Sequence, residues 1–125
     1  MSDELSFEKW LDEAEDTEIV KEKIAWIEIK KGTEIFGEKA KNDEPYLLIS
    51  DGYNSFPIKI PKGMQVTIDD EGVKYTITNR VAFKRSYRNS QSKFRQFVEK
   101  YGQTPQPGIE IEIEIDEEGY ANLLL

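Results

Sequence analysis

Cysteine and histidine are both missing from this sequence of 125 residues. Without cysteine the chain can form no disulfide, no thiolate metal site and no cysteine nucleophile. Without histidine it lacks the commonest general base and the commonest zinc ligand, on which most hydrolases and metalloenzymes depend. These two absences predict a protein that is not an enzyme and that holds neither metal nor cofactor.

Long apolar segments are also absent. No apolar run approaches the ~18 residues that a membrane-spanning helix requires, and the acidic opening MSDELSFEKW is the opposite of a signal peptide. We therefore expect no membrane partner and an intracellular, cytoplasmic location. The abundance of Lys, Glu and Ile without Cys or His resembles the residue usage of heat-adapted proteins, which suggests a thermophilic source.

Length and composition predict a single domain over residues 1–125. A chain of this size can bury one core but is short for two ordinary domains. Its apolar content of 38% and its charged content of 34% do not fit a disordered composition. Only residues 1–5 and 32–45 are expected to be flexible, the second because it combines glycines, a proline and many charges.

Charge is distributed very unevenly along the chain. Residues 80–101, called the basic stretch below, hold seven cations against one acid, Glu99, and so carry +6. The whole chain carries −8, which leaves −14 on the other residues. Because most of the surface would repel phosphate, any nucleic acid has to be held locally. The cations of the basic stretch are Arg80, Lys84, Arg85, Arg88, Lys93, Arg95 and Lys100.

Aromatic side chains are interleaved with these cations. They are Phe83, Tyr87, Phe94, Phe97 and Tyr101. Cations neutralise phosphates and aromatic rings stack on bases, so the mixture is typical of a surface that binds single-stranded nucleic acid.

Two helices are predicted in the N-terminal part of the chain. Residues 6–15 place apolar side chains at i, i+3, i+4 and i+7, which is typical of an amphipathic helix that packs on its own domain or docks into a partner's groove. Residues 18–31 give a second helix, with apolar residues at helical spacing and Gly32 after its end. The competing interpretation of this second segment is a strand over 24–29, favoured by its isoleucines.

The middle of the chain is predicted to form two hairpins. Residues 46–50 and 55–60 flank a turn, and Pro57 indicates that the second of these strands lies at a sheet edge, because proline donates no ladder hydrogen bond. Residues 64–69 are expected to pair with a long strand over 73–85. The polar face of that long strand would carry Lys74, Arg80 and Lys84.

A helix over 91–101 is predicted from an apolar stripe at i, i+3, i+4 and i+7, with Asn89 or Ser90 as its cap and Gly102 after its end. Because this apolar stripe is expected to pack on the core, its two phenylalanines are poor candidates for base stacking. The better candidates stand near the ends of elements: Phe83, Tyr87 and Tyr101.

Strict alternation of isoleucine with acids over 109–116 predicts a strand, which pairs with 120–125 through a turn at Gly119. Its row of carboxylates is a solvated face in our main interpretation and a metal site in a minor one. The apolar end 123–125 is expected to be buried in the sheet or in a homodimer contact. The whole is an α+β fold with an antiparallel sheet of about six strands, two N-terminal helices and one helix inserted before the final β-hairpin.

The same region resembles a known family. The residues Phe97-Val98-Glu99-Lys100-Tyr101-Gly102, followed by Pro105, Gly108, an alternating strand and Glu118-Gly119-Tyr120, are similar to the C-terminal part of small archaeal single-stranded DNA-binding proteins of the ThermoDBP type. The resemblance covers at most a third of the chain. It implies a fold in which helices pack on a small antiparallel sheet, with an apolar cleft rimmed by basic side chains.

The predicted function is non-catalytic binding of single-stranded DNA or RNA in a groove formed by the basic stretch. Its seven cations are the expected phosphate contacts, with stacking by Phe83, Tyr87 and Tyr101. Duplex binding is less favoured, because no helix-turn-helix, zinc-finger or basic-zipper pattern is present.

Two other interpretations stay open. The chain can be a protein-interaction adaptor, a small viral accessory protein, or a DNA mimic that uses its acidic surface. It can also be a magnesium-dependent nuclease with carboxylates at the turns, namely Asp51, Asp69 and Asp70. Acids are common at turns for a simpler reason, since they satisfy local backbone groups there.

Overall fold

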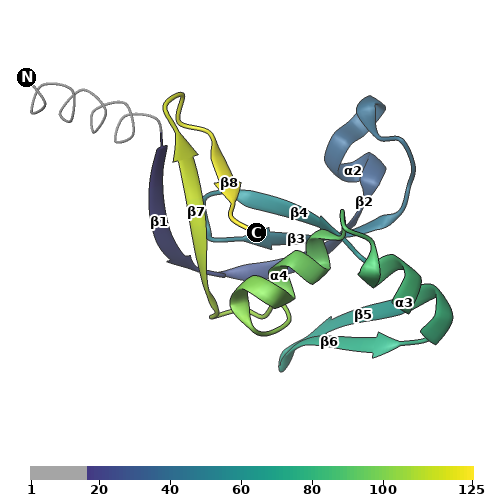
Figure 1. Ribbon diagram of the computed structural model, residues 1–125. Helices are drawn as coiled ribbons and strands as arrows, with labels where there is room; N and C mark the ends of the chain where they lie inside the picture. The colour runs from purple at the N-terminus through teal and green to yellow at the C-terminus, as the bar shows by residue number, and fades with distance from the viewer. Residues whose placement is uncertain (1–16) are drawn as a thin grey trace, which may run out of the picture. The chain divides into compact units, whose positions relative to one another are not determined.

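A computed structural model describes residues 17–125 (Figure 1). The helix expected over 6–15 and the flexible segment 1–5 lie outside the described residues. The strands are β1 (Thr17–Lys23), β2 (Trp26–Lys31), β3 (Pro45–Ser50), β4 (Ser55–Lys59), β5 (Met64–Asp69), β6 (Gly72–Ile77), β7 (Glu110–Asp116) and β8 (Ala121–Leu123). The helices are α2 (Gly32–Phe36), α3 (Arg80–Arg88), α4 (Lys93–Tyr101) and the short 3₁₀ helix η1 (Gly37–Lys39).

The α+β class is confirmed, but the strands form three sheets and not one sheet of about six strands. Their orders are β1-β7-β8, β2-β3-β4 and β5-β6. The edge position predicted from Pro57 is confirmed, because β4 ends its sheet. Pro57 in β4 has no N–H to donate to a further strand, which suits this edge position, and β5 pairs with β6 in a separate sheet.

The described chain divides into two compact units. Residues up to 22, together with 110–124, contain most of β1 and the hairpin of β7 and β8, while residues 23–109 and Leu125 form the other unit. The prediction of a single domain stays a prediction. Within the described residues no helix is both long enough and apolar enough to cross a membrane.

The larger unit is built on β3, which runs antiparallel to β2 on one side and to β4 on the other. Ile49 of β3 lies opposite Ile27 in β2 and opposite Phe56 in β4, and all three side chains are buried. Helix α4 contacts β4 and adds two buried rings to this core. The buried apolar side chains of these elements are Ile27, Leu47, Ile49, Phe56, Ile58, Phe94 and Phe97.

The predicted helix over 18–31 is wrong, because these residues form β1 and β2. The ladder between β2 and β3 extends over all six residues of β2, and the Ala25 N–H donates to the Ser50 carbonyl at 2.7 Å. Isoleucines at helical spacing are also compatible with a strand, and a partner strand decides between the two. The competing strand interpretation over 24–29 was therefore the better one.

The predicted strand over 73–85 is wrong in its second half. It ends at Ile77, and α3 begins after Asn79, whose side-chain oxygen accepts a hydrogen bond from the Ala82 N–H at 3.1 Å. This cap satisfies one of the free N–H groups at a helix start. The half-buried face of α3 then follows at helical spacing: Ala82, Phe83, Ser86 and Tyr87.

The remaining predictions for this unit are mostly confirmed. Both hairpins of the middle region are present, and the helix predicted over 91–101 is α4, although Ser92 and not Asn89 or Ser90 caps it. Gly102 ends α4 in the left-handed conformation. The segment 32–45, predicted as a loop, begins with α2 and η1.

In the smaller unit β7 is the central strand, between β1 and β8 (Figure 1). The alternating strand predicted over 109–116 and its hairpin with the C-terminal residues are confirmed, with Ile113 opposite Leu123. Ile111 and Ile113 are buried. The turn is closed by Asp116, whose carboxylate accepts the backbone N–H groups of Glu118 and Tyr120.

Gly63 joins the end of the β2-β3-β4 sheet to the start of α3. Its carbonyl accepts hydrogen bonds from the N–H groups of Thr78 and Asn79 at 2.8 and 3.1 Å. Its φ is 77°, and a Cβ at this position would lie 2.4 Å from the Asn79 oxygen and 2.8 Å from the Phe83 nitrogen. Only glycine combines this backbone conformation with such a close approach.

We predict that Gly63→Ala lowers the free energy of unfolding by about 2–4 kcal/mol, because it adds a backbone clash to the cost of a left-handed alanine. Gly102→Ala is the matched control, since Gly102 has a φ of 75° and its Cβ would meet no atom within 4 Å. It should cost only about 1 kcal/mol. Urea denaturation measures both, and equal losses would show that the contact between Gly63 and α3 is not tight.

Candidate nucleic-acid interface

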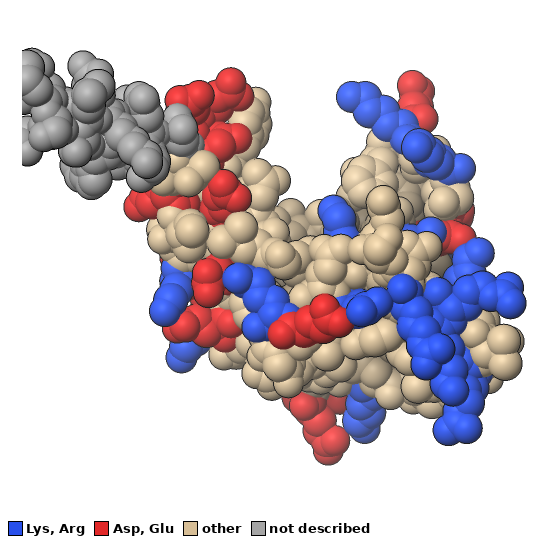
Figure 2. Space-filling view, viewed as in Figure 1, with Lys and Arg blue, Asp and Glu red and all other residues tan. Residues whose placement is uncertain are grey.

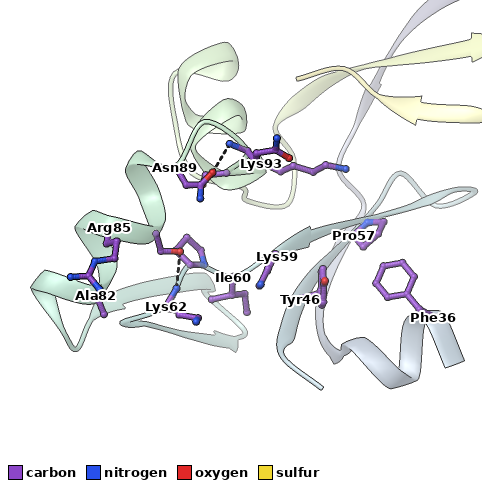
Figure 3. A pocket seen from close by; sticks show the side chains of 14 residues that line it. Phe36, Tyr46, Pro57, Lys59, Ile60, Lys62, Ala82, Arg85, Asn89 and Lys93 are labelled. Carbon is purple, nitrogen blue, oxygen red and sulfur yellow. Dashed lines mark hydrogen bonds between the residues drawn. The ribbon is translucent and has the colours of Figure 1, made fainter. Parts of the chain in front are cut away.

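A groove of about 710 Å³ lies in the larger unit. In Figure 3, Phe36 and Tyr46 stand at one end of it, Lys62 and Arg85 at the other, and Lys59 between them. Its lining comes from α2, β3, β4, the connection to β5, α3, the turn before α4 and the first residue of α4. The lining residues are Phe36, Tyr46, Pro57, Lys59, Ile60, Pro61, Lys62, Ala82, Arg85, Ser86, Asn89, Gln91, Ser92 and Lys93.

Every charged side chain in this lining is a cation. They are Lys59, Lys62, Arg85 and Lys93. Among residues 17–125 no Asp or Glu lines the groove, although the chain holds 25 acids against 17 bases. Figure 2 shows Lys and Arg gathered over α3 and Asp and Glu gathered over the hairpin of β7 and β8. The groove therefore has a positive local field in an acidic protein.

One acid lies next to the groove without lining it. The Glu44 carboxylate forms an ion pair with the Lys59 ammonium group through its oxygen Oε2. That oxygen is buried, and no hydrogen bond of regular geometry reaches it from the described residues. Since the Lys59 side chain is 47% exposed, Lys59 can still meet a ligand, but Glu44 partly neutralises its charge.

The groove is held together by a backbone contact as well. The Lys62 N–H donates to the Ser86 hydroxyl oxygen at 3.2 Å, which ties the connection after β4 to α3 (Figure 3). Together with the contacts of Gly63, this bond fixes Lys62 and Arg85 on elements that cannot move independently.

Of the residues predicted from the sequence, the structure brings Arg85 and Lys93 into the groove. Arg95 instead pairs with Glu99 on its own helix, Nε to Oε1 at 2.8 Å, and this hydrogen bond raises the pKa of Arg95. The other predicted cations are exposed but do not line the groove: Arg80, Lys84, Arg88 and Lys100.

The aromatic residues predicted to stack on bases are half-buried in ring contacts of their own. The Tyr87 ring lies 5.3 Å from that of Phe83 and 6.3 Å from that of Phe94, between centroids. The Tyr101 ring lies 4.6 Å from that of Phe97, and Lys100 stands 5.8 Å from the Tyr101 ring. Phe83, Tyr87 and Tyr101 thus support α3 and α4, and the rings that line the groove are different ones.

Sequence reasoning missed Phe36, Tyr46, Lys59 and Lys62. One signal was available, because the predicted hairpin over 46–60 places Tyr46 directly opposite Lys59, as the structure does. That register puts a ring and a cation side by side on one face. Nothing in the local sequence pattern indicates that Arg85 lines the same groove as this face.

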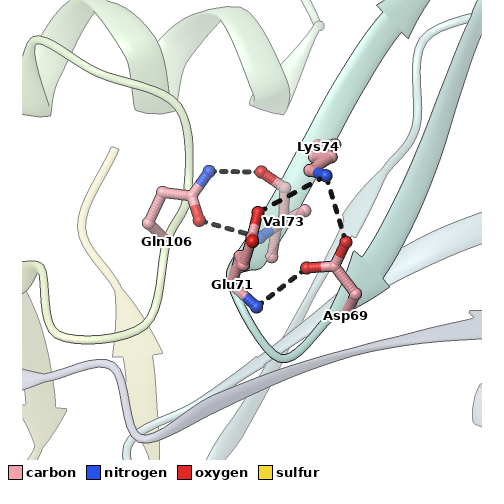
Figure 4. A network of polar contacts seen from close by, with 5 residues as sticks. All are labelled: Asp69, Glu71, Val73, Lys74 and Gln106. Carbon is pink, nitrogen blue, oxygen red and sulfur yellow. Dashed lines mark hydrogen bonds and ion pairs between the residues drawn. The ribbon is translucent and has the colours of Figure 1, made fainter.

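Two of the three turn carboxylates considered for a nuclease, Asp69 and Asp51, have local partners. Asp69 accepts the Glu71 N–H at 2.8 Å and lies 3.2 Å from the Lys74 ammonium group (Figure 4). The Glu71 N–H, followed by Lys74, lowers the pKa of Asp69. Asp51 likewise accepts two N–H groups of its own turn. Residues 17–125 contain no group of three or more acids placed to hold a metal ion.

The segment after α4 is tied to β6 by two side chains. The Gln106 amide donates to the Val73 carbonyl at 2.5 Å and accepts the Val73 N–H at 2.9 Å, so it acts as one more strand residue beside β6 (Figure 4). The Tyr75 hydroxyl donates to the Pro105 carbonyl at 2.7 Å. Burial raises the pKa of the Tyr75 phenol.

Comparisons with protein-family models, curated proteins and solved structures give no match to this chain. The groove and its chemistry are therefore the features from which a function can be inferred.

We predict that Tyr75→Phe lowers the free energy of unfolding by about 1 kcal/mol at neutral pH, because one hydrogen bond to the Pro105 carbonyl is lost. The phenol also makes stability pH-dependent. Its pKa is higher in the folded chain than the value of about 10 expected when unfolded, so above that pH the unfolded state releases the proton first and stability falls.

Urea denaturation of the wild type and Tyr75→Phe at neutral pH and near pH 10.5 measures both effects. The wild type should lose more stability than the variant between the two pH values. Lysine titration affects both proteins alike, so equal pH dependence in the two would contradict the role of the buried phenol.

Proposed function

We propose that the protein binds single-stranded nucleic acid, without catalysis, in the groove between α2 and α3. The observation that carries this proposal is the composition of the lining, in which four cations accompany Phe36 and Tyr46 and no acid is present. Cations that neutralise phosphates, next to rings that stack on bases, are the two components of single-strand binding sites.

The rings favour a single strand over a duplex. A base can stack on a side chain only when one of its faces is exposed, and in a duplex both faces are covered by neighbouring base pairs. Phe36 is 40% exposed, so its ring is accessible to such a base. Phosphates of the same strand would then lie within reach of Lys59, Lys62 and Arg85.

The cations outside the lining have a second role in this proposal. Arg80, Lys84, Arg88 and Lys100 enlarge the positive field of the basic stretch, and such a field raises the association rate without fixing the ligand. The row of acids on β7 gives the opposite field, which restricts binding to the basic region.

Fluorescence anisotropy of a labelled single strand and of the same sequence as a duplex tests the proposal. We expect tighter binding of the single strand and an affinity that falls as salt rises, with a slope of about −0.7 per phosphate contact. No binding of the single strand at low salt would overturn the proposal and favour the interaction-domain or DNA-mimic interpretation.

Arg85→Glu is predicted to weaken single-strand binding about tenfold or more, because it replaces a phosphate contact with repulsion in the groove. Arg88→Glu makes the same change of net charge on the same helix, outside the lining. Since it alters only the surrounding field, its effect should be about threefold or less. Equal losses for the two variants would show that net charge, and not the groove, determines binding.

Glu44→Gln is predicted to tighten binding about two- to fivefold, because it releases Lys59 from a partly exposed ion pair. The salt dependence should become steeper by up to about 0.7, the contribution of one more phosphate contact. Glu34→Gln is the matched control, since Glu34 pairs with Lys30 at 4.0 Å and lines no part of the groove. The same gain in both variants would contradict a specific role for Glu44.

A further inference from the structure

The groove does not end at Phe36 and Tyr46. A second cavity of about 560 Å³ shares Phe36, Tyr46, Lys59 and Gln91 with it and continues along η1 and the residues after η1. This continuation brings two more cations, Lys39 and Lys41, and no acid of the described part of the chain lines it. The two rings therefore stand at a junction between two basic compartments.

The rings are arranged so that they do not cover each other. Their centroids are 5.4 Å apart and their planes make an angle of 77°, which is an edge-to-face contact. Phe36 keeps 40% of its surface exposed in this arrangement. It thus differs from Phe94 and Phe97, which are buried.

Two acids near α2, Glu34 and Asp43, are already engaged with lysines other than Lys39 and Lys41, whereas Glu38 of η1 forms no ion pair within residues 17–125 and lines neither cavity. Glu34 pairs with Lys30, and Asp43 lies 3.9 Å from the Lys31 ammonium group while accepting a hydrogen bond from the Thr33 hydroxyl. Neither Lys39 nor Lys41 has an ion pair within the described part of the chain. Both are exposed, so their charges are open to an anionic ligand.

We propose that one nucleic-acid strand runs through both compartments, with a single unpaired base stacked on Phe36 at the junction. Phosphates on one side of that base contact Lys62 and Arg85, and phosphates on the other side contact Lys39 and Lys41. The amides of Asn42 and Gln91 lie in the second compartment, where they can hydrogen-bond to a base edge. This inference rests on the proposed function and names the binding mode of that site.

Substitution of Phe36 tests the junction. Phe36→Ala should weaken single-strand binding about 5- to 150-fold, the range expected for the loss of one stacked base. Phe36→Leu keeps an apolar side chain but removes the ring face, so it should lose most of the same affinity. Tyr53→Ala is the matched control, because Tyr53 is 91% exposed and lines neither cavity. It should bind like the wild type.

An abasic site placed at each position of the oligonucleotide in turn identifies the stacked base. At one position the abasic site should weaken binding by the wild type as much as Phe36→Ala weakens binding to the intact strand. The affinity of Phe36→Ala should not change with an abasic site at that position. The double variant Lys39→Gln, Lys41→Gln should reduce the salt slope by about 1.4, the contribution of two phosphate contacts to a single strand.

The outcomes separate this inference from the proposed function. If the wild type binds no single strand, both fail. If it binds, and Arg85→Glu weakens binding while Phe36→Ala and the double lysine variant do not, the proposed function stands and the continuous path is wrong. Circular dichroism of each variant verifies folding, and Phe36 is exposed enough for its removal to leave the core intact.

Discussion

The end of the ladder between β2, β3 and β4 determines where the groove lies. At this end Lys31 faces Pro45, and Tyr46 faces Lys59. The chain leaves β2 directly into α2 at Gly32, whose N–H donates to the Glu44 carbonyl at 2.9 Å. This strand register thus brings together three segments: the first residues of α2, the residues just before β3, and the C-terminal end of β4. A shift by one residue would turn Tyr46 and Lys59 to the opposite face of the sheet.

The charges follow from the same geometry. Acids are abundant near the end of this ladder. Two of them pair with lysines outside the lining, Glu34 with Lys30 and Asp43 with Lys31, whereas Glu44 pairs with Lys59 in the lining. Partly exposed pairs of this kind contribute little to stability. Their main effect is electrostatic, because the pairs of Glu34 and Asp43 neutralise acids with lysines that lie outside the lining.

Sequence patterns predicted the elements that have one dominant period. The stripe of α4 with Gly102 after it, and the alternation of Ile111 and Ile113 with acids in β7, each admit a single interpretation. Residues 18–31 fit two periods, and the pairing of β1 with β7 and of β2 with β3 decides between them. Residues 80–88 were misread because the continuing alternation outweighed a helix cap at Asn79. The groove could be predicted only in part. The tertiary fold brings Phe36 and Arg85 into the lining of one groove, and no local pattern connects them.

The kind of cation in the groove limits what the site can distinguish. Lysine is a mobile point charge and contacts phosphate without fixed geometry, whereas arginine can read planar groups through two parallel hydrogen bonds. Lys59, Lys62 and Lys93 outnumber Arg85 in the lining, and phosphate contacts carry no sequence information. Stacking on Phe36 tolerates every base, because each has a π face. The proposed binding would therefore distinguish paired from unpaired strands and place little restriction on their sequence.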